Sequence, residues 1–347
     1  MGRIEGTDRS VAGYATPEDA PLDRTLRPAA FAEFVGQTRI VENLSVYIAA
    51  AKQRGEALDH VLLSGPPGLG KTTLAHIVAR ELGAELRGTS GPALERPGDL
   101  VGLLTSLEEH DVLFIDEIHR LGPVVEEYLY AAMEDFRIDV TIDKGPAARA
   151  IKFELKRFTL VGATTREGLL TGPLRSRFGI QEKLEFYPPA DLARILARSA
   201  RLLRTEVDED GLRRIAERSR GTPRVANRFL KRAADFALVK GDGRVTAAGA
   251  TDALERMGVD AHGLDRMDRA ILDAVLRHGP APVGLKTIAV TVGEAEDTIE
   301  EVYEPFLIQQ GLLQKTPRGR LASPRAAELV GWEGEKPKGG AQGELFG

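Results

Sequence analysis

The sequence contains no cysteine, a single tryptophan and no long apolar run. Without cysteine there are no disulfides, no Cys-ligated zinc or iron–sulfur clusters and no thiol nucleophile, and the composition fits a reducing compartment. No stretch approaches the roughly 18 consecutive apolar residues that a membrane helix needs. The opening residues MGRIEGTDRS lack the apolar segment of a signal peptide. We therefore expect a cytoplasmic protein.

What the chain does contain is the balance of an ordinary globular protein. Its 347 residues carry 47 Lys and Arg against 52 Asp and Glu, a net charge of -5, and 42% of them are hydrophobic. At about 100 to 200 residues per domain, this length predicts two or three domains. The composition excludes disorder throughout and a wholly basic surface, although a local basic patch remains possible.

Apolar periodicity predicts an α/β domain in the first half of the chain. Apolar runs at 61–63, 112–115 and 158–162 alternate with helical stretches, and an amphipathic helix from about residue 38 precedes them, so we expect a parallel sheet with helices on both faces. Residues 1–24 are polar and contain two prolines, which predicts a flexible N-terminal arm. This large domain is expected to span 25–187, because Tyr187 precedes two prolines that end any regular element.

A different period interrupts the large domain between residues 138 and 155. Apolar and polar residues alternate on both sides of the turn-like Lys144-Gly145-Pro146, which predicts a β-hairpin with one apolar face. Two interpretations of that face remain open. It packs on the sheet, or it forms an exposed docking surface.

Two smaller domains are expected to follow. Residues 188–258 show only helical periodicity and predict a small all-α domain, whose many Arg and Lys residues are typical of a solvated helical face. Residues 259–332 predict a helix, a helix-turn-helix and a hairpin, which is the order of a winged helix, with Pro305 kinking the last helix. The Gly- and Lys-rich residues 333–347 predict a disordered tail.

The strongest motif is GPPGLGKT at 65–72, a complete phosphate-binding loop between an apolar run and a helix. In such a loop glycines let backbone N–H groups surround the phosphates, Lys71 reaches the β- and γ-phosphates, and the Thr72 hydroxyl ligates Mg²⁺. The run 112–115 ends in Asp116, suited to hold Mg²⁺, and Glu117, suited to orient the attacking water. The sequence therefore predicts ATP hydrolysis rather than nucleotide binding alone.

Two later segments carry side chains suited to the γ-phosphate. GATTR at 162–166 puts small polar groups at the end of a strand. PLRSRFG at 173–179 contains Arg175 and Arg177, and an arginine in such a loop can stabilise transition-state charge in the site of a neighbouring subunit.

Taken in order, these motifs resemble those of the AAA+ ATPases, and within them the RuvB family of bacterial Holliday-junction branch-migration motors. The resemblance covers roughly residues 22–330 and includes DRTLRP at 23–28, DEIHR at 116–120, VVEEYLYAAMED at 124–135, GTPR at 221–224 and LIQQGLLQKTPRGR at 307–320. One position departs from it. Lys315 stands where many members are expected to carry Arg, which keeps the charge and loses the bidentate geometry.

The resemblance implies roles for individual residues. On the adenine side of the nucleotide it places Leu26, Arg27 and Tyr187. The residues that it places around the phosphates and Mg²⁺ are Gly68, Leu69, Gly70, Lys71, Thr72 and Thr73. It makes Thr164 the first sensor, Arg224 the sensor of the second domain, and Arg177, in preference to Arg175, the arginine finger. It also places the segment Glu134, Asp135 and Phe136 near the nucleotide at a subunit interface.

The resemblance further implies a hexameric ring that hydrolyses ATP and pulls double-stranded DNA away from a Holliday junction, in recombination, DNA repair and the SOS response. Hairpin 138–155 would dock the junction-binding partner RuvA, and RuvC would join the resolving complex. The winged helix would bind DNA through Lys315, Arg318 and Arg320, because residues 315–325 carry no acid in an otherwise acidic domain. The acidic helix 294–304 is expected to face away from the phosphates.

Three other functions fit parts of the chain. A protein unfoldase binds polypeptide with an aromatic pore loop, yet no Phe, Tyr or Trp lies between Tyr47 and Phe114. A clamp-loader subunit would end in a helical collar rather than a winged helix. A non-enzymatic DNA-binding regulator would leave Glu117 and Arg177 without a role.

Overall fold

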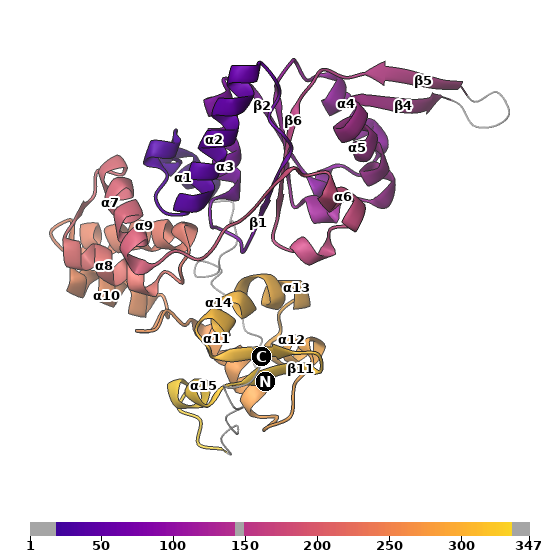
Figure 1. The fold of residues 1–347 in the computed structure, drawn as a ribbon. Coiled ribbons are helices and arrows are strands. Elements are labelled where there is room, and N and C mark those ends of the chain that lie inside the picture. Colours follow the sequence, from indigo (N-terminus) through magenta and orange to yellow (C-terminus); the bar gives the residue numbers. More distant parts are fainter. Residues whose placement is uncertain (1–18, 143–148, 335–347) are drawn as a thin grey trace, which may run out of the picture. The chain divides into compact units, whose positions relative to one another are not determined.

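The computed structural model describes residues 19–142 and 149–334 (Figure 1). Two compact units account for them. The first, here called the sheet unit, is Leu26–Glu185, and the second, here called the helical unit, combines Phe186 onward with the residues up to Thr25. None of the helices in the described ranges has both the length and the apolar character that crossing a bilayer requires.

A five-stranded parallel sheet forms the centre of the sheet unit. Its strands lie in the order β2 (Leu86–Ser90), β3 (Val112–Asp116), β6 (Thr159–Thr164), β1 (Val61–Ser64) and β7 (Ile180–Lys183). On one side of the sheet lie α2 (Thr38–Arg54) and α3 (Lys71–Leu82), and on the other α4 (Pro97–Thr105) and α5 (Pro123–Asp135) (Figure 1). Because both faces are covered, β1 and β6 are buried along their whole length.

Short elements complete the connections around the sheet. They are the 3₁₀ turns η1 (Phe31–Glu33), η2 (Gly91–Ala93), η3 (Ile118–Arg120) and η4 (Glu167–Leu169), and helix α6 (Gly172–Ser176). The register pairs Ser64 with Thr164, and Ser90 with Asp116. The carboxyl ends of four strands therefore meet at one edge of the sheet.

The predicted hairpin is formed by β4 (Arg137–Ile142) and β5 (Arg149–Glu154), paired antiparallel. At its base Ile138 is buried in the core of the sheet unit, whereas Phe153, its partner across the ladder, is exposed. The turn Lys144-Gly145-Pro146 lies outside the described residues. At the base of the hairpin, one side chain of the apolar face therefore packs against the core, while the Phe153 ring on the paired strand is exposed.

The helical unit begins with the small domain, here called the lid. It consists of α7 (Pro189–Leu202), α8 (Glu209–Arg218), α9 (Pro223–Lys240) and α10 (Ala247–Arg256). The prediction of helices alone was incomplete, because β8 (Glu206–Val207) pairs in parallel with β9 (Arg244–Val245). Two residues are too few to produce a strand period in the sequence.

The predicted N-terminal arm also needs a correction at its inner end. Residues 1–18 lie outside the described part, but helix α1 (Asp19–Leu26) includes residues 19–24, which we expected to lack regular structure. Asp23 of this helix pairs with Arg224 of the lid at 3.1 Å. The sequence pattern of residues 19–24 gives no helix signal, and the contact with Arg224, 201 residues from Asp23, could not be read from it.

The second part of the helical unit, here called the head, is the expected winged helix. It contains α11 (Arg266–Leu276), α12 (Leu285–Val292), α13 (Glu296–Thr298), the π-helix η5 (Ile299–Tyr303), α14 (Glu304–Gln309), β10 (Leu313–Thr316), β11 (Gly319–Ala322) and α15 (Pro324–Leu329). Strands β10 and β11 form the wing, which Val283 extends by bridging to Arg320. Pro305 lies in the first turn of α14, directly after the π-helix. Proline removes a helical hydrogen bond and distorts the turn before it, which accounts for a π-helix at this point.

His60, just before β1, joins three distant segments of the sheet unit. Its Nε2 lies 3.1 Å from the carbonyl oxygen of Met133, and its Nδ1 accepts the N–H of Leu160 at 2.9 Å. Both bonds are satisfied only by a neutral ring that carries its proton on Nε2. Burial, the largest cause, lowers the pKa of His60 below its ordinary value, although the Met133 carbonyl acts in the opposite direction.

We expect acid to destabilise the sheet unit through this ring. The unfolded histidine takes up a proton as the pH falls through about 6.5, whereas the folded ring resists protonation, so the free energy of unfolding should fall between about pH 7.5 and 5.5. His60→Gln should lower stability by about 1–3 kcal/mol, because buried groups lose partners, and should flatten this pH dependence. Urea unfolding of both proteins across the pH range checks both effects, and an equal pH slope in the variant would contradict the assignment.

Candidate active site

The phosphate loop connects β1 to α3 at the carboxyl edge of the sheet. Gly65, Gly68 and Gly70 all have positive φ, at 132°, 78° and 106°. A Cβ atom at Gly65 would lie 2.6 Å from the Leu184 carbonyl oxygen, so only glycine fits where the loop leaves the strand. This path directs the first N–H groups of α3 toward the loop, as an anion site requires.

Lys71, the first residue of α3, is buried inside this loop. Its Nζ donates to the carbonyl oxygens of Gly65 at 2.7 Å and Pro66 at 2.8 Å. The loop backbone thereby fixes the ammonium group beside the loop that is expected to surround the phosphates.

The predicted magnesium ligands lie side by side. The Thr72 hydroxyl is 3.4 Å from Oδ2 of Asp116 at the end of β3. A hydroxyl and a carboxylate at this separation suit the oxygen ligands and the octahedral geometry of Mg²⁺. The residues therefore fit the ion that the sequence led us to expect.

Glu117 follows Asp116 in a left-handed backbone conformation, with φ at 48°. Its carboxylate pairs with Nη1 of Arg120 at 3.0 Å, in a contact that is largely exposed. Such a pair contributes little free energy, so the carboxylate can leave Arg120 at small cost and turn toward a water molecule.

Thr164, at the end of β6, is fully buried and bonded to the neighbouring strand end. Its hydroxyl lies 2.9 Å from Nδ1 of His119 and accepts the N–H of Arg166 at 3.0 Å. Burial is the largest cause that lowers the pKa of His119, and the nearby Glu117 carboxylate opposes it. A neutral His119 therefore links Thr164 to the turn that carries the two acids.

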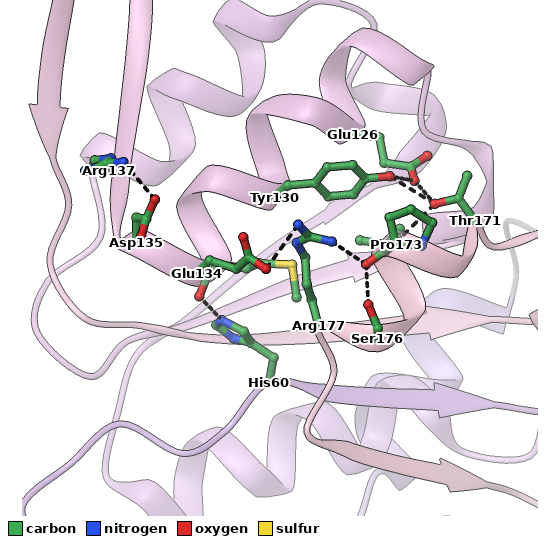
Figure 2. Close-up of polar contacts among 12 residues, drawn as sticks. His60, Glu126, Tyr130, Glu134, Asp135, Arg137, Thr171, Pro173, Ser176 and Arg177 are labelled. Atoms are coloured by element: carbon green, nitrogen blue, oxygen red, sulfur yellow. Dashed lines mark hydrogen bonds and ion pairs between the residues drawn. The ribbon is translucent and has the colours of Figure 1, made fainter.

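Arg177 is held within the sheet unit by three groups (Figure 2). Its Nη2 lies 3.1 Å from Oε1 of Glu134, its Nη1 donates to the Pro173 carbonyl at 2.6 Å, and its guanidinium carbon lies 4.3 Å from the centre of the Tyr130 ring. The side chain is only 19% exposed. A planar cation with polar groups at its edge and a ring on its face is well ordered.

The ring that supports Arg177 is itself fixed by hydrogen bonds. The Tyr130 hydroxyl contacts Glu126 and lies 2.9 Å from Oγ1 of Thr171, the N-cap of α6 (Figure 2). Burial, followed by the bond to Glu126, raises the pKa of Tyr130. Helix α5 thus sets the position of the loop that carries the arginine.

Arg175, the second arginine of the same segment, has different contacts. Its Nη2 pairs with Oε1 of Glu167 at 2.5 Å, while Oε2 of Glu167 accepts from the Ser64 hydroxyl at 3.0 Å. Arg175 is thereby joined to the end of β1, whereas Arg177 lies against the end of α5.

The three residues at 134–136 do not act as one group. Glu134 pairs with Arg177, and Asp135 pairs with Arg137 at 3.0 Å (Figure 2). Phe136 packs edge-on against Phe158, with ring centres 5.8 Å apart. Of the three, only Glu134 contacts another residue that the sequence analysis placed in the site.

The predicted adenine-side and sensor residues are divided between the two units. Leu26 and Arg27 belong to the sheet unit, where the charge of Arg27 helps lower the pKa of His76 on α3, burial being the larger cause. Tyr187 and Arg224 belong to the helical unit. In that unit the Tyr187 N–H donates at 2.9 Å to the carbonyl of Gly221, the first residue of the GTPR segment.

The wing contains the predicted DNA-binding residues in unequal environments. Arg318 is exposed at the turn. Arg320 is buried, and its Nε and Nη2 bond the two oxygens of buried Glu304 at 2.5 and 3.1 Å. Lys315 pairs with Glu300 at 2.7 Å. Glu300 and Glu304, in the last turn of the helix expected at 294–304, thus lie against the wing, and the orientation of that helix toward DNA phosphates stays a prediction.

The sequence analysis missed the partners of these charged residues. Arg120 stands three positions after Glu117, which is a usable signal for a pair on one turn. No spacing in the sequence indicates the other contacts, which join distant segments: Glu134 with Arg177, Tyr130 with Arg177, and Glu304 with Arg320.

Known proteins match most of this chain. Three family models match consecutive segments: the P-loop domain of the Holliday junction DNA helicase RuvB at 26–184, the RuvB AAA lid domain at 187–260 and the RuvB C-terminal winged helix domain at 261–331. The expected order of P-loop, helical and winged-helix domains is thereby confirmed.

Individual relatives agree with the family models. A Holliday junction branch migration complex subunit RuvB from Myxococcus xanthus is 61% identical over 331 residues, which cover 95% of this chain and 96% of that protein. The Thermotoga maritima RuvB Holliday junction branch migration motor superposes with a TM-score of 0.82 at 48% identity, over 89% of this chain and 99% of that one. A single-residue variant of the same Thermotoga protein gives 0.83. The chain belongs to the RuvB family of P-loop ATPases.

Proposed function

We propose that this chain is the ATP-hydrolysing motor subunit that drives branch migration of Holliday junctions. The observation that carries the proposal is the meeting of Lys71, Thr72 and the two acids at the end of β3 at one sheet edge, in a chain that also carries a winged helix. The Myxococcus and Thermotoga relatives, named as a branch migration subunit and a branch migration motor, support the same conclusion.

The hydrolytic roles follow from the geometry of the sheet unit. Lys71 and the phosphate-loop N–H groups bind the phosphates of ATP, and Thr72 and Asp116 hold Mg²⁺, which neutralises charge on the phosphates when bound. Glu117 accepts a proton from the attacking water once its carboxylate leaves Arg120. Thr164 reports the γ-phosphate through its bond to His119, and half-buried Thr165 is the second candidate for that contact.

The remaining nucleotide contacts come from more than one unit and more than one subunit. Leu26, Arg27 and Tyr187 border the adenine, and Arg224 senses nucleotide from the lid. In a hexameric ring Arg177 leaves Glu134 and reaches the γ-phosphate of the neighbouring subunit, where it stabilises the transition state. Glu134, Asp135 and Phe136 lie beside that interface.

The head binds duplex DNA through the phosphates, because a motor that travels along any sequence needs contacts that carry no sequence information. Exposed Arg318 and half-exposed Lys315 are the residues suited to this role. Hairpin 138–155 docks RuvA, and exposed Phe153 at its base is a suitable contact. RuvC joins in the resolving complex, and the assembly works on DNA in the cytoplasm.

The first test compares ATP hydrolysis with and without duplex DNA. Hydrolysis by the wild type should rise with DNA, and Lys71→Ala should abolish hydrolysis because the phosphates lose their only lysine in the loop. Lys52→Ala, a change at an exposed position of α2, serves as the control and should hydrolyse normally. Hydrolysis that ignores DNA in an assembled ring would favour a protein-directed function instead.

Subunit mixing tests whether Arg177 acts on its neighbour. Arg177→Ala should bind ATP normally and lose hydrolysis by a factor of about 10³ or more. Mixing Arg177→Ala with Lys71→Ala subunits should restore part of the activity, because the second variant supplies Arg177 to intact nucleotide sites. Arg175→Ala is the matched control and should retain most hydrolysis. No recovery in rings shown to contain both variants would contradict action in trans.

Arginine variants of the wing separate DNA binding from stability. Arg318→Ala should weaken DNA binding and reduce its salt dependence, with the melting temperature unchanged. Arg320→Ala should instead destabilise the head by about 3–5 kcal/mol, because it leaves Glu304 buried and unpaired. Thermal unfolding and binding to a labelled duplex at several salt concentrations distinguish the two. A stable Arg320→Ala protein with weakened binding would restore Arg320 as a direct DNA contact.

A further inference from the structure

A buried ion cluster lies where the lid contacts the head. In the loop between α8 and α9, Arg220 places Nη1 3.3 Å from Oδ2 of Asp265 and Nη2 2.9 Å from Oδ1 of Asp268. The side chains of Arg220, Asp265 and Asp268 are 3%, 9% and 0% exposed. One side chain of the lid therefore reaches into the N-terminus of α11, the first helix of the head. We call these three residues the Arg220 cluster.

The same guanidinium packs on two aromatic rings of the head. Its carbon lies 4.4 Å from the centre of the Phe306 ring and 5.6 Å from that of Tyr303. These rings belong to α14 and η5, which lead into the wing. Acids at the edge and rings at the face use the planar geometry that arginine has and lysine lacks. Arg220 thus contacts both the start of the head and the helix before the wing.

The carboxylates are also tied to their own helix. Asp265 caps α11 by accepting the N–H of Asp268, whose carboxylate in turn accepts the N–H of Asp265. Burial, the largest cause, raises the pKa of Asp268, and the Arg220 charge opposes it. Hydrogen bonds at the start of α11 therefore hold the two acids in position independently of Arg220.

Burial makes this contact sensitive to angle. A small rotation of the head against the lid would separate the guanidinium from the carboxylates without admitting water, and unpaired buried charges are strongly unfavourable. An exposed ion pair, by contrast, follows such a rotation by exchanging its partner for water. The Arg220 cluster consequently resists rotation between lid and head.

The loop that carries Arg220 also adjoins two residues proposed to contact nucleotide, Tyr187 and Arg224. Arg220 and Gly221 have consecutive positive φ values of 58° and 67°, and α9, with Arg224 in its first turn, begins two residues later. The Gly221 carbonyl accepts the N–H of Tyr187 at 2.9 Å. A Cβ atom at Gly221 would lie 2.9 Å from Cβ of Phe186, so only glycine fits at this position of the turn.

We propose that Arg220 is a positioning residue that makes the head move with the lid, so that a change at the nucleotide reaches the wing. Its importance for DNA movement rests on the proposed function, but the rigid lid–head connection does not. The loop joins the two parts: its backbone bonds Tyr187 and continues into the turn of α9 that carries Arg224. Its Arg220 side chain binds the head through the Arg220 cluster.

A distance measurement tests the connection in the full-length protein without using its activity. Because the chain has no cysteine, Glu209→Cys on α8 and Val290→Cys on α12 introduce two specific labelling positions. These side chains are 93% and 77% exposed. Pulsed electron resonance between spin labels at these positions should give one narrow distance distribution in the wild-type background and a broader one with Arg220→Met. An equally narrow distribution would overturn the proposal.

A coupling measurement tests the consequence. Arg220→Met should keep ATP hydrolysis and DNA binding but lose most of the base pairs migrated per ATP hydrolysed, while Arg220→Lys should recover part of that ratio. Arg277→Met is the matched control, because Arg277 pairs at 2.7 Å with Asp273 on the exposed side of α11. Unchanged migration per ATP in Arg220→Met would overturn the proposed role in coupling.

A third variant protects the test against a failure to fold. Combining Arg220→Met with Asp265→Asn and Asp268→Asn removes the three charges of the Arg220 cluster and keeps side chains that can cap α11. This protein should regain the melting temperature of the wild type and still show the broad distance distribution. A narrow distribution would show that packing alone fixes the angle. If the wild type itself failed to migrate junctions, the proposed function would fail while the distance measurement still decided the role of Arg220.

Discussion

The parallel register of the central sheet is the constraint on which the proposed chemistry depends. Because β1, β3 and β6 run in one direction and end at the same level, the phosphate loop, the two acids and Thr164 emerge at a single edge. A shift of one residue in any of these strands would turn the buried side chains outward and remove the polar ones from the edge. The buried apolar strands therefore determine the geometry of the site as well as the stability of the unit.

Several charged residues proposed to act on ATP have partners within the same chain. Lys71 is held by loop carbonyls, Glu117 by Arg120, and Arg177 by Glu134. Binding of substrate or of a neighbouring subunit must therefore exchange one set of contacts for another. The exposed pairs exchange at low cost, whereas the buried pairs, Arg320 with Glu304 and Arg220 with its two acids, are suited to hold parts of the head in place.

The lid and the head differ from the sheet unit in how they are held. Within each domain apolar helices form the core, but the boundary between lid and head contains buried charges and a tight turn with consecutive left-handed residues. Apolar surfaces can slide over one another, whereas a guanidinium bonded to two separate carboxylates allows one arrangement. This difference is the physical basis for a head that keeps its angle to the lid.

The sequence alone determined the class of the protein, and it predicted the residues that are proposed here to act in catalysis. The glycine spacing of the phosphate loop, the acids after an apolar run and the helix-turn-helix before a hairpin are local patterns, because each reflects contacts between residues close in the chain. Strand β2 was missed since its residues are half exposed and produce no apolar run. Only the tertiary structure decided which charges are buried and with whom they pair. Glu304 lies 16 residues from Arg320 and Asp268 lies 48 from Arg220, and contacts over such separations depend on packing that no local pattern records.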